Sequence, residues 1–194
     1  MRTNRRKLMA SRELPSNYER LEYIENTSTA YIETGFIPNI NSSFLYTFAY
    51  TQFTNDDCFG VGTYNYGWGL HTHSTEKIGY TFGNDLMVHY KNDFSKHSFG
   101  LIGNQVIYDD KMVSTFIRKE IDDNTNPLKI FCPHSQSIGN YQYQRVYGLK
   151  LWNEDTLVHN FIPVRRRNDD KIGMLDKIDG QFYTSPNGVA FTGG

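Results

Sequence analysis

Hydrophobic and polar residues alternate over short stretches along most of this chain, and turn residues separate the stretches. The clearest example is residues 44–53 (FLYTFAYTQF). One side of this stretch carries only aromatic rings: Phe44, Tyr46, Phe48 and Tyr50. Because alternation with a period of two places every second side chain on one face, the stretch predicts a β-strand. Its other face is also partly apolar, which favours a position in the middle of a sheet.

Similar stretches follow one another along the chain, and helical periodicity is nearly absent. They predict strands at residues 21–25, 30–34, 58–61, 64–71, 77–82, 86–90, 98–102, 105–109, 113–117, 128–132, 145–152 and 156–162, with a closing pair around Met174 and Phe182. The two-residue link of Gly103 and Asn104 predicts a tight hairpin, because glycine adopts positive φ angles easily. More than ten short strands without helices between them predict an all-β fold, an antiparallel sandwich or barrel.

Composition and charge bound the organisation of the chain. The 194 residues suit one domain, and no apolar run approaches the roughly 20 residues of a membrane span. We expect a basic arm at residues 1–13 and one domain at residues 14–194. The arm carries five basic side chains: Arg2, Arg5, Arg6, Lys7 and Arg12. The chain beyond residue 12 has 15 basic and 21 acidic side chains, so a cationic arm precedes an acidic body.

Two interpretations of the arm stay open. It is either a solvated terminus or a segment that becomes ordered on an acidic partner surface. A secretory signal does not fit, because Glu13 and Pro15 follow the cationic stretch instead of an apolar run. The two cysteines, Cys58 and Cys132, both lie in apolar surroundings. We expect two buried thiols and a reducing compartment, although one disulfide between them is arithmetically allowed.

The two ends of the domain resemble a known family. Residues 14–38 (LPSNYERLEYIENTSTAYIETGFIP) are similar to the opening of LamG-like jelly-roll domains in the concanavalin A-like lectin and glucanase superfamily, of the type common in bacteriophage and gut-bacterial surface proteins. Residues 146–152, 157–163, 172–176 and 180–183 are similar to that family's final strands and terminal hairpin. The chain departs from the family pattern at residues 27–30 and at Glu33. The resemblance implies two curved antiparallel sheets packed face to face, with the terminal strands paired near one edge.

The superfamily that the chain resembles includes glucanases, so the sequence is searched for catalytic residues. Laminarinase-type members carry Glu-x-Asp-x-Glu on one strand, and the nearest match here is residues 120–124 (EIDDN). Its fifth position is an asparagine, whose amide cannot serve as the acid/base group of a glycosidase. The chain also lacks a Gly-x-Ser-x-Gly elbow and a phosphate-binding loop. We therefore expect no catalytic residues, no cofactor and no enzymatic activity.

Metal binding has little support in the residue pattern. His71 and His73 project to one side of a strand, but Glu76 is the only nearby third ligand. Acidic pairs occur at residues 56–57, 109–110, 122–123 and 169–170 without the ligand ladder of a calcium loop. We interpret the pairs as solvated turns and expect no metal site.

The stretch at residues 64–71 (YNYGWGLH) is the main candidate for ligand binding. Its alternating rings, flanked by glycines, suit stacking on the apolar face of a sugar. The candidate ligand-binding residues are Asn65, Tyr66, Trp68, His71, Asn84 and Asp85. The alternative, which we favour, is that these rings fill the core between the sheets.

The sequence predicts the fold better than the function. Basic residues cluster in the arm and at residues 165–167, but no motif that reads nucleic-acid bases is present, so sequence-specific nucleic-acid binding is not expected. The leading hypothesis is a non-enzymatic interaction module: a phage virion protein for capsid decoration, in a fibre or at the tail, made in the host cytoplasm. Its arm would bind capsid or tail proteins. The alternatives are a lectin-like module that binds glycans at a bacterial surface, and a glycan hydrolase.

Overall fold

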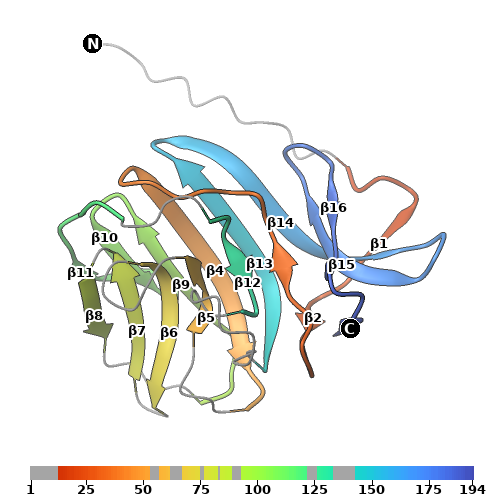
Figure 1. Ribbon diagram of the computed structural model, residues 1–194, viewed down its shortest axis with the longest axis horizontal. Coiled ribbons are helices and arrows are strands. Elements are labelled where there is room, and N and C mark those ends of the chain that lie inside the picture. Colours follow the sequence, from red (N-terminus) through yellow and green to blue (C-terminus); the bar gives the residue numbers. More distant parts are fainter. Residues whose placement is uncertain are drawn as a thin grey trace.

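The computed structural model describes residues 13–52, 57–61, 67–74, 77–82, 84–88, 93–121, 126–132 and 143–194. In this part of the chain the regular structure is β throughout, with strands in two antiparallel sheets that pack face to face (Figure 1). The all-β fold expected from the alternating pattern is confirmed, and of the sandwich and barrel that the pattern left open it is the two-sheet sandwich, as the resemblance implied. The described residues include no helix with the length and hydropathy needed to cross a membrane.

The larger sheet has eleven strands. Its main path runs in the order β11 (Lys111–Thr115), β10 (Gln105–Tyr108), β9 (His97–Ile102), β4 (Ser42–Tyr50), β13 (Gln144–Asn153), β14 (Thr156–Arg166), β15 (Lys171–Asp176) and β16 (Phe182–Tyr183). Three short strands join it from the chain ends: β1 (Tyr18–Arg20), β2 (Ile24–Glu25) and β17 (Thr192–Gly193). Strands β11 and β16 therefore lie at opposite ends of the main path (Figure 1).

The smaller sheet has six strands. They lie in the order β3 (Ile32–Glu33), β12 (Lys129–Ile130), β5 (Asp57–Val61), β6 (Trp68–Ser74), β7 (Lys77–Phe82) and β8 (Asn84–Val88). Strands β5 to β8 follow one another as neighbours, whereas β3 and β12 meet from positions nearly a hundred residues apart.

Aromatic side chains fill the space between the sheets. The four alternating rings of β4 are each at most 2% exposed: Phe44, Tyr46, Phe48 and Tyr50. Trp68 of β6 is fully buried, and its ring meets that of Phe44 edge to face with centroids 5.0 Å apart. Each fully buried large apolar side chain contributes about 1.5–3 kcal/mol. The rings are therefore the main link between the two layers.

Two tight turns shape the end of the larger sheet near β11. Gly103 has a φ of +58° and Asn104 does not have positive φ, which is the type II′ pattern and confirms the predicted hairpin between β9 and β10. The next link, Asp109 and Asp110, has φ angles of +46° and +61°, the type I′ pattern. Aspartate is among the residues that tolerate this left-handed conformation.

The chain ends pair with each other, as the resemblance implied. Strand β2 lies between β13 and β17, and β1 pairs with β14. The strand predicted at residues 21–25 is confirmed only in part: β2 covers Ile24 and Glu25, whereas residues 21–23 lie between β1 and β2. Between them, the amides of Glu22 and Tyr23 both donate to the carbonyl of Gly194, at 2.6 and 3.0 Å. A shared acceptor of this kind interrupts the regular ladder.

Candidate functional site

Trp68, the central ring of the predicted ligand-binding platform, is buried in the core. Trp68 has no exposed surface, and its ring contacts those of Phe44 and Phe36 at centroid distances of 5.0 and 6.1 Å. A ring enclosed in this way cannot stack on a sugar, so the assignment of Trp68 as a ligand-binding residue is corrected. Leu70, on the same face of β6, is also fully buried. Asn65 and Tyr66 lie outside the described residues.

The remaining ligand candidates are described only by their backbone. His71 lies in β6 opposite Gly79, and Asn84 and Asp85 lie in β8 opposite Phe82 and Thr81. Strand β7 separates β6 from β8, and Phe82 pairs with Trp68 on one side and with Asn84 on the other. The side chains of these three candidates lie outside the described residues.

Several other residues singled out in the sequence lie partly or wholly outside the described residues. The five basic residues of the arm are outside it: Arg2, Arg5, Arg6, Lys7 and Arg12. Glu76 and the end of the carboxylate motif, residues 122–124, are outside it as well. Glu120 is exposed and Ile121 is buried. Cys132 is buried as expected, whereas the side chain of Cys58 is not described.

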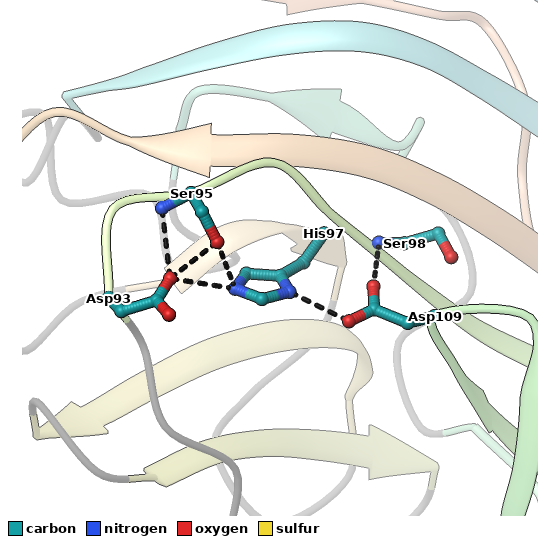
Figure 2. A network of polar contacts seen from close by, with 5 residues as sticks. All are labelled: Asp93, Ser95, His97, Ser98 and Asp109. Carbon is teal, nitrogen blue, oxygen red and sulfur yellow. Dashed lines mark hydrogen bonds and ion pairs between the residues drawn. The ribbon is translucent and has the colours of Figure 1, made fainter.

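A polar network around His97 is the most developed cluster in the described chain (Figure 2). The imidazole lies between two carboxylates: Nδ1 is 2.9 Å from Oδ2 of Asp109, and Nε2 is 3.1 Å from Oδ1 of Asp93. The hydroxyl of Ser95 is 3.0 Å from Nε2 and 2.5 Å from the same Asp93 oxygen. The His97 ring also stacks on the ring of Tyr108, and the side chain of His97 is only 11% exposed.

Local turns position both carboxylates. Asp93 accepts the backbone N–H of Ser95 at 3.0 Å, which closes a small turn just before β9. Asp109 begins the type I′ turn after β10, and its Oδ1 accepts the backbone N–H of Ser98 at 2.9 Å. The network therefore fastens the segment before β9 to the turn between β10 and β11.

Hydrogen bonding stabilises the charged form of Asp93. Donation from the side chain and backbone of Ser95, and then from His97, holds the pKa of Asp93 well below its usual range.

The residue pattern did not single out this cluster, and the pair at residues 109–110 was interpreted as a solvated turn. The available signal was a histidine four residues after an aspartate and close in sequence to an acidic hairpin turn.

The distances among Ser95, His97 and Asp109 are those of a serine hydrolase triad, but the hydrogen bonding does not suit catalysis. A triad requires the serine hydroxyl to give its proton to Nε2. Here the carboxylate of Asp93 accepts from the Ser95 hydroxyl at 2.5 Å and is also within 3.1 Å of Nε2. An ionised carboxylate only accepts, so it draws both protons toward itself. This arrangement suits a structural fastening better than an activated nucleophile.

A second cluster joins His159 of β14 to Asp176 at the end of β15. Nδ1 of His159 donates to Oδ2 of Asp176 at 2.6 Å, and Oδ1 of Asp176 accepts the backbone N–H groups of Asn160 and Ile178. Burial by itself raises the pKa of Asp176, but these donors outweigh it and hold the pKa below its ordinary value. The fully buried carboxylate thus fastens β14 to the turn after β15.

The same cluster contains the one set of metal-ligating atoms found among the described residues. Ligand atoms of His159, Asp176 and Asp179 all lie within 4.8 Å of one another. A histidine and two carboxylates are a donor set that suits a divalent transition metal. However, His159 and Asp176 already satisfy each other by a direct bond, and the backbone occupies the other oxygen of Asp176. The pair therefore needs no metal to be stable.

Basic side chains gather where the described chain begins. Strand β1 pairs with the end of β14, so that Tyr18 lies opposite Arg166 and Glu19 opposite Arg165. The backbone N–H of Arg167 donates to the carbonyl of Asn17 at 2.8 Å. We call residues 165–167 the arginine segment. It lies beside β1, near the beginning of the described chain.

Comparisons with known proteins add no relative. No protein-family model matches this chain, and a search of the curated proteins finds no match either.

Proposed function

We propose that this protein is a non-enzymatic interaction module of a phage particle, which attaches to other capsid or tail proteins through its basic arm. The observation that carries the proposal is the separation of charge. Residues 1–12 hold five basic side chains and no acid, whereas the rest of the chain has 21 acidic and 15 basic side chains. The body of the module is itself acidic and competes for the arm. The arm therefore binds a partner protein in preference to the body where the partner's surface carries more negative charge or fits the arm better.

The arginine segment supports this assignment because it places basic side chains on the folded body beside β1. Arg165 pairs with Glu19 at 3.7 Å and Arg166 with Asp169 at 2.6 Å. Arg167 is exposed, and its side chain makes no ion pair with any described residue. A partner carboxylate can therefore bind Arg167 without displacing an existing pair.

The phage particle enters the proposal from the resemblance alone. The opening at residues 14–38 and the closing segments at residues 146–152 and 157–163 are similar to jelly-roll domains common in bacteriophage and gut-bacterial surface proteins. The buried position of Trp68 reduces the support for a glycan-binding module, since that ring was the centre of the expected platform.

A length-preserving variant tests the proposal. Replacing the five basic arm residues by glutamine removes five charges and leaves the body unchanged. At a few tenths of a kcal/mol per exposed contact, we expect incorporation into purified particles to fall by about tenfold. The measurement is copies per particle by quantitative mass spectrometry, together with the melting temperature, which should not change.

The matched control exchanges arginine and lysine within the arm, so that length and charge are both kept. This control should be incorporated at the normal level. Normal incorporation of the glutamine variant would refute the anchoring role of the arm. Loss of incorporation in both variants would show that specific side-chain geometry, and not charge, mediates attachment.

A further inference from the structure

The position of His97 suggests a role that the interaction module does not require. Its ring adds a side-chain link between the turn before β9, through Asp93, and the turn between β10 and β11, through Asp109. Figure 2 shows the ring between the two carboxylates, with each nitrogen directed at one of them. Both contacts lie at hydrogen-bond distance.

The number of protons on the ring decides how many of these contacts can be hydrogen bonds. An ionised carboxylate can only accept, so each nitrogen must carry a proton to bond its aspartate. The imidazolium form has two N–H groups and satisfies Asp93 and Asp109 together. A neutral ring has one N–H, so the second contact places a nitrogen lone pair against a carboxylate oxygen. Loss of one proton therefore breaks one side of the connection.

The charged, polar and aromatic side chains around His97 come from the elements packed against it. The turn before β9 contributes Asp93 and Lys96, β10 contributes Tyr108, and the following turn contributes Asp109. On the other side β4 places Phe48 opposite His97. The amine of Lys96 is directed elsewhere, over the ring of Tyr147 at 4.2 Å and 3.8 Å from Glu22. Histidine is the side chain in this set that ordinarily titrates between pH 5 and 8.

The segment held by this connection is under backbone strain. Phe94, directly after Asp93, has a φ of +64°, an unusual conformation for a bulky side chain. The bonds from Asp93 to Ser95 and His97 span this residue and hold the strained turn closed. The turn keeps the half-exposed ring of Phe94 and the amine of Lys96 at the surface.

We propose that His97 is a pH-sensitive clamp that fastens residues 93–97 to the turn at Asp109 when its ring carries two protons, and releases the Asp93 side when the ring loses one. The remaining proton stays on Nδ1 of His97, where it is donated to Oδ2 of Asp109. The other oxygen of Asp109 accepts the amide of Ser98, which holds this carboxylate in place. Rising pH thereby removes one of the bonds that hold the strained turn at Phe94 closed.

Nuclear magnetic resonance of the full chain tests the clamp directly. The probes are the backbone amides of Ser95 and Ser98, which bond Asp93 and Asp109, and the ring nitrogens of His97. As the pH is raised, we expect one shared midpoint for the ring and the Ser95 amide. Below it both nitrogens should be protonated, and above it only Nδ1 should be.

Three variants complete the test. His97→Gln should abolish the titration of the Ser95 amide, whereas His159→Gln, at the other histidine–aspartate pair, should leave it intact. Asp93→Asn keeps the ring and Asp109, so the ring should still titrate while the Ser95 amide no longer follows it. The clamp is refuted if the Ser95 amide is insensitive to pH in the natural chain, if its titration survives in His97→Gln, or if the neutral ring keeps its proton on Nε2.

Discussion

Phe44 of β4 and Trp68 of β6 meet edge to face across the two sheets, with ring centroids 5.0 Å apart. Both side chains are fully buried, and Phe44 also stacks against Phe99 of the neighbouring strand. This contact joins the two sheets. The sequence left open whether the rings at residues 64–71 stack on a ligand or fill the core. The aromatic stretch before His71 contributes to the core through Trp68 and Leu70.

Trp68→Ala should destabilise the fold strongly. Truncation of a buried tryptophan leaves a cavity and costs about 3–5 kcal/mol. Urea unfolding followed by circular dichroism measures the loss. Trp152→Ala, at a partly exposed position in β13, is the matched control and should cost less. A Trp68→Ala protein of unchanged stability would contradict the core position.

Gly173→Ala should also be destabilising, because a Cβ atom at this position would overlap the carbonyl oxygen of Tyr183 in the adjacent strand β16. Relief of the overlap requires backbone movement, at a cost of about 1–3 kcal/mol. Gly148→Ala is the control, since its Cβ would meet only the carbonyl of Phe161 at 3.4 Å. Thermal unfolding should separate the two variants, and equal melting temperatures would argue against this packing of β15 on β16.

Asp176→Asn should reduce stability in a pH-dependent way. The pKa of Asp176 is lowered in the folded state, so its charged form stabilises the fold above the unfolded value of about 4, and this contribution is lost as the pH falls. At pH 7 we expect a loss of about 1–3 kcal/mol from the weakened bond to His159.

Urea unfolding at several pH values between 3 and 7 measures this effect. The difference between the natural chain and Asp176→Asn should shrink toward pH 3. Asp155→Asn, in the exposed turn between β13 and β14, should give a small difference at every pH. A constant penalty for Asp176→Asn across the range would show that the charge is not what stabilises the pair.

Removal of residues 192–194 should weaken the closure of the sandwich. The deletion removes the pairing of β17 with β2 and the carbonyl that accepts the amides of Glu22 and Tyr23. At about 1 kcal/mol per hydrogen bond, we expect a loss of about 2–4 kcal/mol in the free energy of unfolding. Thr192→Ala keeps every backbone bond and should be nearly neutral. If the deletion were equally neutral, the terminal pairing would not contribute to stability.

The candidate site was less accessible to sequence reasoning than the fold. Asp93 and His97 are four residues apart, and Asp109 belongs to a turn that the pattern indicated. Their approach depends on the register of β9 with β10, which places Phe99 opposite Tyr108. Register is set by side-chain packing and turn type together, so no local pattern reports that one imidazole lies between two carboxylates.

The sequence by itself determined the all-β class, the position of most longer strands and the inward face of β4, because alternation with a period of two is a local property of the chain. Only the tertiary structure decided the short strands and their partners. Ile24 of the two-residue strand β2 pairs with Val146 on one side and Gly193 on the other. Two residues show no period, and their pairing depends on backbone hydrogen bonds between segments more than a hundred residues apart.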